Sequence, residues 1–583
     1  MSRDGEEKST VYISNYEKWL NSDMLSDQEK NELLALKGSP KEIENRFSSY
    51  LSFGTAGLRG LMKTGMNAMN RHTVAYVTQA LANLINSCGR GNDGVAIAYD
   101  SRNNSELFAK TAARVLAANS VKVYIFDELR PTPELSFALR HLGCVAGINI
   151  TASHNPSEYN GYKAYWEDGA QLPPEHAKTV TDTLAGLDIF RDVKYTDFDG
   201  AVNKGLITII GKEIDEKYIE CVMKEAVNPN AISDVADSLK IVFTPLHGAG
   251  YRLVPDVLTR CGLRYLYPVK EQLKPDGNFP TVSKPNPEFP EAFRLGIAIA
   301  EEVGSDLVIA CDPDADRVGV MARKSDGEFT TITGNQMGAL LLDYIITAYE
   351  NTGTMPNEPY AVKSIVSTEL ATKICLAHNV KMYNVLTGFK FIGEVIKKHE
   401  EIGSGSFIFG FEESYGYLKG TYARDKDAVV AAMLITEMTA YYKTRSMTLY
   451  DALEALWARY GFSFERNEQI EMPGFDGKER MARFMASIRA NAPSEMGGVK
   501  VKTFGDYLKG TFRNVITGEE TPTGLPLSDV LYFVLENGDV IVIRPSGTEP
   551  KVKIYYLITS TDEAHAGTVF VAYSDSMKKL TLN

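Results

Sequence analysis

The sequence predicts three related α/β domains with mixed or parallel sheets and a smaller C-terminal α+β domain, all around one cleft. The main observation is that a set of three strand-like runs, with helical segments between them, occurs three times. A polar loop follows the third strand of each set, and ligands of parallel sheets bind beyond the carboxyl ends of the strands. The length of 583 residues is also too great for one hydrophobic core.

Composition and charge limit the classes of partner. A formal net charge of −13 and a pI near 5.3 argue against nucleic acid or an anionic membrane as the main partner. They do not exclude an anionic small ligand, because a local cluster of cations can reverse the field within a cleft. A hydrophobic content of 44% and a charged content of 23% are ordinary for a soluble globular protein.

The cysteines and the N-terminus indicate a cytoplasmic protein. Six cysteines lie far apart with no CxxC pair, which is typical of reduced thiols rather than of a disulfide framework. Residues 1–10 are charged and lack the apolar core of a signal peptide. No stretch reaches the ~20 apolar residues that a membrane helix needs.

From the N-terminus, residues 11–50 are predicted to form amphipathic helices. Their expected packing positions are Tyr16, Trp19, Leu20, Leu33, Leu34 and Leu36. A glycine-rich loop at residues 53–60 follows and carries Arg59. Its spacing matches neither the phosphate loop of nucleotide hydrolases nor a dinucleotide fingerprint, so locally a plain turn is as good an interpretation as a ligand site.

The strand sets come next along the chain. The first set comprises residues 95–99, 121–126 and 145–150; the second 241–243, 265–267 and 307–310; the third 362–366, 382–386 and 406–409. The α+β domain is predicted from the runs 530–535, 540–543 and 552–558 and a last helix. The expected domains are therefore residues 1–205, 206–325, 326–460 and 461–583.

The polar loop after the first set spells Thr-Ala-Ser-His-Asn-Pro at residues 151–156. Ser153 and His154 lie at the end of an apolar run, and Lys163 follows within reach. A hydroxyl, an imidazole and an amine on one loop are the parts of an activated nucleophile. Taken alone, the Ser-His pair is also compatible with a capped polar turn.

The loop after the second set carries Asp312, Asp314 and Asp316. Alternate carboxylates can converge on one hard divalent cation, and without a cation they would repel one another. A calcium-hand loop fits poorly, because Arg317 occupies the place of its glycine and Arg323 that of its closing glutamate. The alternative is a solvated acidic turn, which the apolar strand before it disfavours.

Two further loops suit a sugar phosphate. Glu412 and Ser414 could contact sugar hydroxyls, and Arg544, Ser546, Gly547 and Thr548 combine the donors that a phosphate dianion accepts. The cations Lys390, Arg424 and Lys426 are equally compatible with a surface role on local grounds. A hydroxyl nucleophile, a metal, a polyhydroxyl reader and a phosphate clamp together indicate phosphoryl transfer on a sugar phosphate.

Four of these loops, in this order, resemble the motifs of the α-D-phosphohexomutase family of sugar-phosphate mutases. They are residues 151–156, 312–317, 410–416 and 544–550. The spellings at residues 53–60 and 160–166 look most like the branch that holds phosphoglucomutase-2 and phosphopentomutase. Phe411 stands where many relatives have a glycine, which leaves the sugar preference open.

The resemblance implies a mutase that interconverts glucose 1- and 6-phosphate through a phosphoserine at Ser153 and a sugar bisphosphate. It implies Mg²⁺ held by the three aspartates and a phosphoserine oxygen, and glucose 1,6-bisphosphate as an activator. Arg59, His154 and Lys163 would flank the phosphoserine, with Lys163 as general acid/base, and Arg317 would support the reacting centre. Lys390, Glu412, Ser414, Arg424, Lys426, Arg544, Ser546, Gly547 and Thr548 would bind the substrate.

Several alternatives remain at this stage. Within the mutases, the rival substrates are mannose phosphates and ribose or deoxyribose phosphates. Outside them, the chain could be a hydrolase that passes the phosphoryl group to water, or a catalytically silent sensor of sugar phosphates. The expected partners are small sugar phosphates, with neither nucleic acid nor membrane, and the protein is expected to be a monomer or a dimer.

Overall fold

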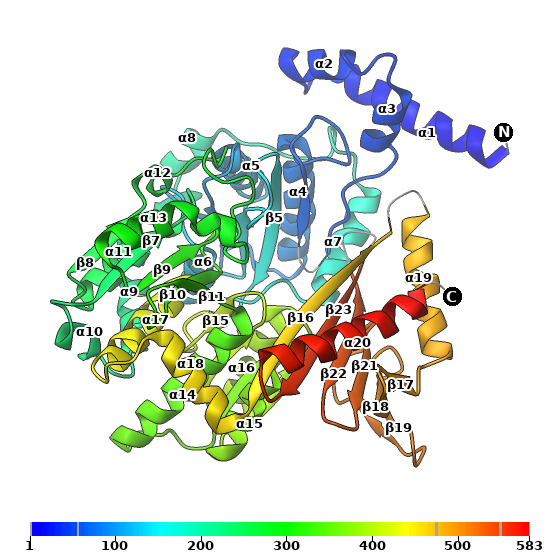
Figure 1. Cartoon of the computed structure of the whole chain (residues 1–583). Helices are drawn as coiled ribbons and strands as arrows, with labels where there is room; N and C mark the ends of the chain where they lie inside the picture. The colour runs from blue at the N-terminus through cyan, green and yellow to red at the C-terminus, as the bar shows by residue number, and fades with distance from the viewer. Residues whose placement is uncertain (1–2, 55–56, 473–475, 547–550, 582–583) are drawn as a thin grey trace. The chain divides into compact units, whose positions relative to one another are not determined.

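The computed structural model describes residues 3–54, 57–472, 476–546 and 551–581 (Figure 1). The chain divides into two compact units. Unit 1 comprises Met1–Thr331, Ile396–Glu401 and Gly416–Ser446, and unit 2 comprises Ile332–Val395, Ile402–Tyr415 and Met447–Asn583. In the part of the chain that the structure describes, no helix is long and apolar enough to span a bilayer.

Three helices begin unit 1: α1 (Arg3–Leu20), α2 (Asp27–Leu34) and α3 (Pro40–Phe47). Tyr16, Trp19, Leu33 and Leu36 are buried as predicted. The prediction for Leu34 is wrong, because its side chain is 41% exposed. Adjacent residues on a helix point about 100° apart, so burying Leu33 turns its neighbour outward.

The first sheet of unit 1 has the strand order β1-β5-β4-β2-β3-β6. Its strands are β1 (Leu58–Leu61), β2 (Val95–Tyr99), β3 (Val123–Phe126), β4 (Ala146–Ile150), β5 (Tyr159–Trp166) and β6 (Ile207–Ile210). β2 pairs in parallel with β3 and β4, whereas β5 is antiparallel to β4 and β1. The helices of this segment are α4 (Arg71–Ser87), α5 (Ser105–Ala118), α6 (Thr132–His141), α7 (Pro174–Gly186) and α8 (Phe198–Asn203).

The second sheet of unit 1 has the order β11-β10-β9-β7-β8. Its strands are β7 (Lys240–Thr244), β8 (Tyr265–Pro268), β9 (Leu307–Cys311), β10 (Val318–Arg323) and β11 (Phe329–Ile332). Its helices are α9 (Lys212–Lys224), α10 (Ala231–Asp234), α11 (Gly250–Arg260), α12 (Lys270–Leu273), η1 (Pro290–Phe293) and α13 (Arg294–Val303). β7 pairs in parallel with β8 and β9, and β9 is antiparallel to β10.

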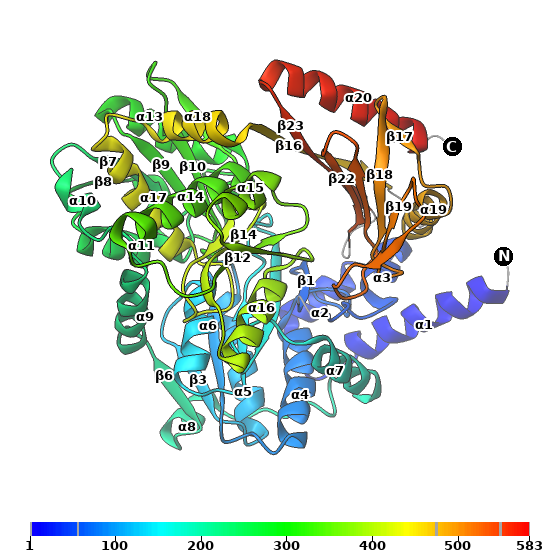
Figure 2. The same cartoon turned by 90° about the horizontal axis from the view of Figure 1, so that it is seen from below.

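Unit 1 is completed by a segment from much later in the chain. It contains β15 (Gly416–Leu418) and α17 (Ala428–Lys443), and α17 packs against α9, α10 and α11 (Figure 2). Nearly every residue in the first three turns of α17 is buried, which explains why its sequence is apolar on all sides. The compact unit that holds the second sheet therefore includes this later helix.

The third sheet has the order β13-β12-β14-β15. In unit 2, β12 (Pro359–Ser364) pairs in parallel with β13 (Lys381–Val385) and β14 (Ser406–Glu412). Its helices are α14 (Gly334–Thr352), α15 (Glu369–Ala377) and α18 (Leu449–Tyr460), and α16 (Phe389–Ile402) crosses the division between the units. In all three sheets the first strand of the predicted set is flanked by the second and the third. The third strand always ends at its polar loop.

The rest of unit 2 is an antiparallel sheet in the order β16-β23-β22-β21-β18-β19-β20, with β17 paired to β18. The strands are β16 (Phe462–Glu471), β17 (Glu495–Met496), β18 (Val499–Asp506), β19 (Thr511–Asn514), β20 (Glu520–Pro522), β21 (Leu531–Leu535), β22 (Val540–Pro545) and β23 (Lys551–Ser560). Both α19 (Gly477–Ala490) and α20 (Glu563–Thr581) pack on β23 (Figure 1). The predicted fold class, three α/β domains and a C-terminal α+β domain, is confirmed.

A buried cluster of charges joins the first turn of α6 to α9. Arg130 Nε lies 2.7 Å from Asp215 Oδ1 and 3.8 Å from Glu134 Oε2. Arg252 contacts the other oxygen of Asp215. Burial, and after it the Asp215 carboxylate, raises the pKa of Glu134 well above its usual value. The folded protein therefore holds a proton on Glu134 that the unfolded chain releases as the pH rises.

We predict that Glu134→Gln becomes more stabilising, relative to the parent, as the pH rises from about 5 to about 8.5. Above the pKa that Glu134 has in the unfolded chain, the folded parent must either keep this carboxyl protonated or bury its charge. Both cost free energy, and a glutamine side chain has neither cost. Urea unfolding at each pH measures the difference in midpoint. Glu128→Gln, which removes an exposed carboxylate nearby, controls for net charge. Parallel pH profiles for Glu134→Gln and the parent would contradict the prediction.

Candidate active site

The serine loop, residues 151–158, connects β4 to β5 in unit 1. Ser153 is only 3% exposed and has φ of 51°, a left-handed conformation that is uncommon for a residue with a side chain. Its Oγ donates to Asp312 Oδ2 at 2.7 Å and lies 3.2 Å from His154 Nδ1. The hydroxyl at the end of one sheet thus directly contacts the loop at the end of the next sheet.

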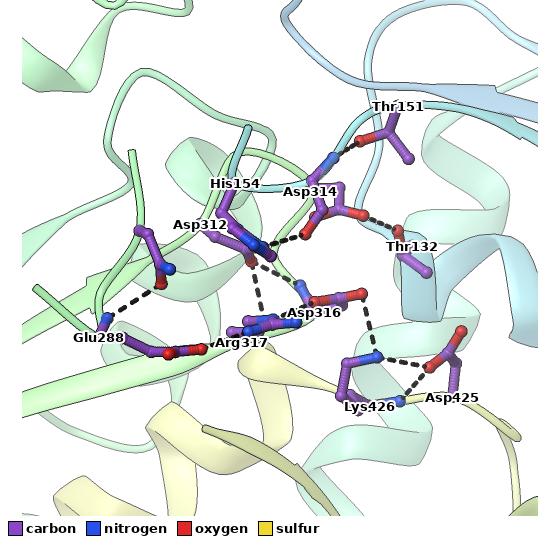
Figure 3. Close-up of polar contacts among 12 residues, drawn as sticks. Thr132, Thr151, His154, Glu288, Asp312, Asp314, Asp316, Arg317, Asp425 and Lys426 are labelled. Carbon is purple, nitrogen blue, oxygen red and sulfur yellow. Dashed lines mark hydrogen bonds and ion pairs between the residues drawn. The ribbon is translucent and has the colours of Figure 1, made fainter. Parts of the chain in front are cut away.

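The carboxylate loop, residues 312–317, connects β9 to β10. Asp312, Asp314 and Asp316 are all buried, and they offer ligand oxygens that lie within 4.8 Å of one another. Asp312 Oδ1 accepts from the backbone N–H groups of Asp316 and Arg317, which folds the loop back on itself. Figure 3 shows the three carboxylates converging.

The three carboxylates differ in their electrostatic surroundings. Burial, and then the Asp314 and Asp316 charges, raises the pKa of Asp312 well above its usual value. Burial would also raise the pKa of Asp314, but the Lys163 ammonium lowers it below its usual value. The pKa of Asp316 is also below its usual value. The carboxylates of Asp314 and Asp316 are therefore charged in a buried space near neutral pH, and this arrangement requires nearby cations.

The remaining acceptor positions fit a hard divalent cation. Among the described residues, Asp314 Oδ1 and Asp316 Oδ1 are buried and have no hydrogen-bond partner. An all-carboxylate set with free oxygens is typical of Mg²⁺, Mn²⁺ or Ca²⁺ and unlike the sulfur and nitrogen sites that zinc prefers. The residues present therefore fit a bound metal ion.

Two lysines from separate segments balance the triad. Lys163 Nζ, from β5, lies 2.7 Å from Asp314 Oδ2 and 3.2 Å from Asp316 Oδ2. Lys426 Nζ lies 3.2 Å from both Asp316 Oδ2 and Asp425 Oδ1 (Figure 3). Burial disfavours the charged form of Lys163, yet the two aspartates raise its pKa above the usual value. It is therefore an ammonium ion at neutral pH.

His154 has the opposite electrostatic balance. Burial, and then the positive charges of Arg317 and Arg59, lowers the pKa of its imidazole well below the usual value. The ring is consequently neutral at pH 7. Beside Ser153 the structure thus places a neutral imidazole, whereas Lys163 is a protonated acid that must give up a proton before it can accept one.

The three predicted arginines of unit 1 have different partners. Arg59 donates to Asn155 Oδ1 of the serine loop at 2.8 Å. Arg317 pairs with Glu288 at 2.5 Å, and its Nε lies 3.7 Å from Asp316 Oδ1 (Figure 3). Arg424 is fully buried and contacts Glu400 and the carbonyls of residues 421 and 423. The guanidinium groups of Arg59 and Arg317 therefore contact the serine loop and the carboxylate loop, whereas that of Arg424 contacts neither loop.

One support of the carboxylate loop was not predicted from the sequence. Thr132, at the first turn of α6, donates from its N–H to Asp314 O and from Oγ1 to Asp314 Oδ2, both at 2.8 Å. Asn149 Nδ2 in turn donates to Thr132 Oγ1 at 2.7 Å. The available signal was the polar Arg-Pro-Thr-Pro-Glu segment that follows β3, because it lies at the same sheet edge as the serine loop.

Unit 2 holds the remaining predicted residues. Glu412 Oε1 accepts from the backbone N–H of Gly388 at 2.6 Å, and Ser364 Oγ donates to Glu413 Oε2 at 3.0 Å. Burial, and then the Glu412 charge, raises the pKa of Glu413 to about 7, with Arg544 acting in the opposite direction. The structure therefore brings the sugar-loop glutamates near Arg544. Burial lowers the pKa of Lys390, and the Ser414 side chain is half-buried. Ser546 donates from its backbone N–H to the Lys551 carbonyl. Gly547 and Thr548 lie outside the described residues.

Comparison with known proteins shows the family. Models of phosphoglucomutase/phosphomannomutase α/β/α domains I, II and III match residues 50–188, 216–327 and 333–460, and the C-terminal domain model matches residues 497–572. The chain therefore belongs to the phosphoglucomutase/phosphomannomutase family, the α-D-phosphohexomutases. The family predicted from the four motifs is confirmed.

Relatives agree with this assignment, and a solved structure has a similar fold. A Staphylococcus saprophyticus phosphoglucomutase is 36% identical over 510 residues, covering 88% of this chain and 91% of its own. A Staphylococcus aureus phosphoglucomutase is 37% identical over 519 residues, with the same coverage. The fold is similar to that of pp63/parafusin from Paramecium in its open form, with a TM-score of 0.69 at 17% identity over 91% of this chain and 94% of that one.

The turn at residues 246–249, which precedes α11, packs against Pro313 of the carboxylate loop. Ala249 N donates to Pro313 O at 2.7 Å, and Leu246 and His247 both have positive φ. A Cβ on Gly248 would lie 2.3 Å from the Cα and 2.6 Å from the carbonyl oxygen of Pro313. Both are backbone atoms, so any side chain at Gly248 must displace the carboxylate loop.

We predict that Gly248→Ala weakens divalent-cation binding by about 10- to 100-fold, the range typical of changes that disturb the support of metal ligands. Titration with Mn²⁺, followed by electron paramagnetic resonance, measures the affinity directly. Gly186→Ala is the matched control, because a Cβ there meets no atom within 4 Å. Parental Mn²⁺ affinity in a folded Gly248→Ala protein would show that the turn does not support the loop.

Proposed function

We propose that this protein interconverts glucose 1-phosphate and glucose 6-phosphate through a phosphoserine at Ser153 and a glucose bisphosphate intermediate. The observation that carries the proposal is the 2.7 Å hydrogen bond from Ser153 Oγ to Asp312, a member of the carboxylate triad. A hydroxyl held against a cation site is the arrangement that phosphoryl transfer needs. The staphylococcal relatives named phosphoglucomutase support the choice of sugar.

Mg²⁺ is the proposed metal, with Asp312, Asp314, Asp316 and a phosphoserine oxygen as its ligands. When bound, it would supply positive charge that offsets the negative charge on the transferring phosphoryl group. Glucose 1,6-bisphosphate is the proposed activator, because it can place a phosphoryl group on Ser153 of enzyme that has lost it.

The proton balance can be assigned to residues of this chain. In the forward transfer a sugar hydroxyl oxygen bonds to phosphorus, the bond from phosphorus to Ser153 Oγ breaks, and the hydroxyl proton is released as Oγ gains one. Neutral His154 lies 3.2 Å from Oγ, and the Lys163 ammonium is the proposed general acid/base. Arg59 would flank the phosphoserine, and Arg317 would support the reacting centre.

The substrate-binding part of the proposal involves both units, each with its own groups. Arg424 and Lys426 belong to unit 1, and Lys390, Glu412, Ser414, Arg544, Ser546, Gly547 and Thr548 to unit 2. The residues of unit 2 include hydrogen-bond donors that suit a phosphate dianion. For Arg424, whose guanidinium contacts Glu400, substrate binding requires a change of partner.

The predicted division into residues 1–205, 206–325, 326–460 and 461–583 is also part of this proposal. Three family matches fall within these ranges, and the second, residues 216–327, extends past the boundary at 325. The branch of phosphoglucomutase-2 and phosphopentomutase remains the proposed subgroup, on the spellings at residues 53–60 and 160–166. The proposed location remains the cytoplasm.

We predict that Ser153→Ala lowers kcat by about three orders of magnitude or more, because the covalent route is removed. The assay couples glucose 6-phosphate formation to its dehydrogenase at saturating glucose 1-phosphate and bisphosphate. Ser157→Ala, which removes another hydroxyl of the same loop, should retain turnover. Transfer of label from radioactive bisphosphate to the parent, but not to Ser153→Ala, completes the test. Near-parental turnover in Ser153→Ala would reject the assignment.

The sugar preference has its own test. We predict that glucose 1-phosphate gives a higher kcat/KM than mannose 1-phosphate or ribose 1-phosphate, measured side by side with the same enzyme. A higher value for ribose 1-phosphate would replace the proposed activity with that of a phosphopentomutase. Stoichiometric release of inorganic phosphate would instead indicate a hydrolase, because a mutase keeps the phosphoryl group from water.

A further inference from the structure

A buried arginine outside every motif of the sequence holds the serine loop. Arg102 lies between β2 and α5, and its side chain is 0% exposed. Its guanidinium donates from Nη1 to the carbonyls of Pro156 and Tyr159, at 2.8 and 3.0 Å. From Nη2 it donates to the carbonyls of Ser153 and Asn155. Four carbonyl groups of one loop and its adjoining strand therefore share a single cation.

A carboxylate orients the same guanidinium and reaches Ser153 by a second route. Asp100 Oδ2 lies 3.3 Å from Arg102 Nε and accepts from Thr151 Oγ1 at 2.6 Å. Thr151 Oγ1 in turn accepts the backbone N–H of Ser153 at 2.8 Å. The N–H and the C=O of Ser153 are thus both fixed, one through Thr151 and the other through Arg102.

An aromatic ring covers the arginine. Arg102 Cζ lies 5.1 Å from the centre of the Phe279 ring, within the range of a cation–π contact. Phe279 is buried and precedes η1, so it belongs to the segment around the second sheet. Next to it, a Cβ on Gly277 would lie 2.3 Å from Asn103 N, so the two segments meet without a gap. Water is excluded from the guanidinium, which strengthens its hydrogen bonds.

These contacts offset a backbone cost. A left-handed conformation is unfavourable for a residue with a side chain and persists only where the surroundings determine it. At Ser153 this conformation is accompanied by the contact of Oγ with Asp312. If the loop relaxed to a right-handed or extended conformation at Ser153, the hydroxyl would change direction relative to the triad.

We propose that Arg102 is a positioning residue for phosphoryl transfer at Ser153: its guanidinium fixes the serine backbone so that Oγ faces the carboxylate triad. The inference rests on the proposed function of Ser153. Lysine cannot replace this arginine, because an ammonium presents three donors on a flexible chain, whereas the guanidinium presents five in a planar fork. Arg102 contacts no reacting atom, and its effect is confined to the geometry of the loop.

The test compares Arg102→Lys with Arg130→Lys. Arg130 is a matched control, because it is equally buried and paired with carboxylates, and those carboxylates belong to Asp127, Glu134 and Asp215 rather than to the serine loop. We expect Arg102→Lys to lower kcat by about 100-fold, as a misplacement of about 1 Å does, with KM for glucose 1-phosphate changed by less than about threefold. Arg130→Lys should lower the melting temperature comparably and keep the parental kcat.

A second measurement separates positioning from general destabilisation. Amide hydrogen exchange of the peptide over residues 151–160 should be faster in Arg102→Lys than in the parent and in Arg130→Lys. Phe279→Leu keeps the arginine and its hydrogen-bond partners but removes the ring that covers it, so it should give a smaller loss of kcat, again at constant KM. This milder variant decides the question if Arg102→Lys does not fold.

The outcomes also separate this inference from the proposed function. If Ser153→Ala is inactive while a folded Arg102→Lys retains the parental kcat, the positioning role is rejected and the phosphoserine stands. If the kcat of Arg102→Lys falls no more than that of Arg130→Lys, the role is likewise rejected. If Ser153→Ala retains turnover, the proposed function fails and the inference fails with it.

Discussion

The site depends on one electrostatic constraint, the placement of three carboxylates in a space from which water is excluded. Such charges are tolerated only with compensating cations and donors. Lys163 and Lys426 supply ammonium groups from distant segments, Thr132 supplies a hydroxyl and an N–H, and Ser153 supplies a second hydroxyl. Among the described residues, Asp314 Oδ1 and Asp316 Oδ1 nevertheless accept no hydrogen bond. The groups that surround the triad thus leave open the positions where one more positive charge would bind.

Backbone strain gathers around the same place. Ser153, Ala315, Leu246 and His247 all have positive φ, and they lie in the serine loop, the carboxylate loop and the turn that supports it. Each needs contacts that hold it, such as Thr151 at the N–H of Ser153. Conformations of this kind are typical of places where function fixes the direction of a side chain.

Much of this arrangement could be predicted from the sequence, because the information is local. The strands β4, β9 and β14 are apolar runs that end in polar loops, so their positions and the gathering of Ser153 with the aspartates followed from the pattern alone. Arg102 and Thr132 escaped prediction, because their partners lie on other segments and no local spacing marks them. Arg424 shows the reverse: its position in the chain was evident, but the direction of its guanidinium depends on Glu400, which no motif specifies.

The discontinuity of unit 1 has a consequence for how the chain acquires its structure. During synthesis the carboxylate loop emerges well before residues 416–446, which bring Lys426 and α17. Until then the triad lacks one of its two ammonium groups, and the face of α11 that α17 covers is open. Such long-range closure slows folding and exposes apolar surface in intermediates. A nascent chain that ends before α17 therefore exposes the kind of apolar surface that chaperones bind. The C-terminal sheet, in contrast, pairs only strands that follow residue 461.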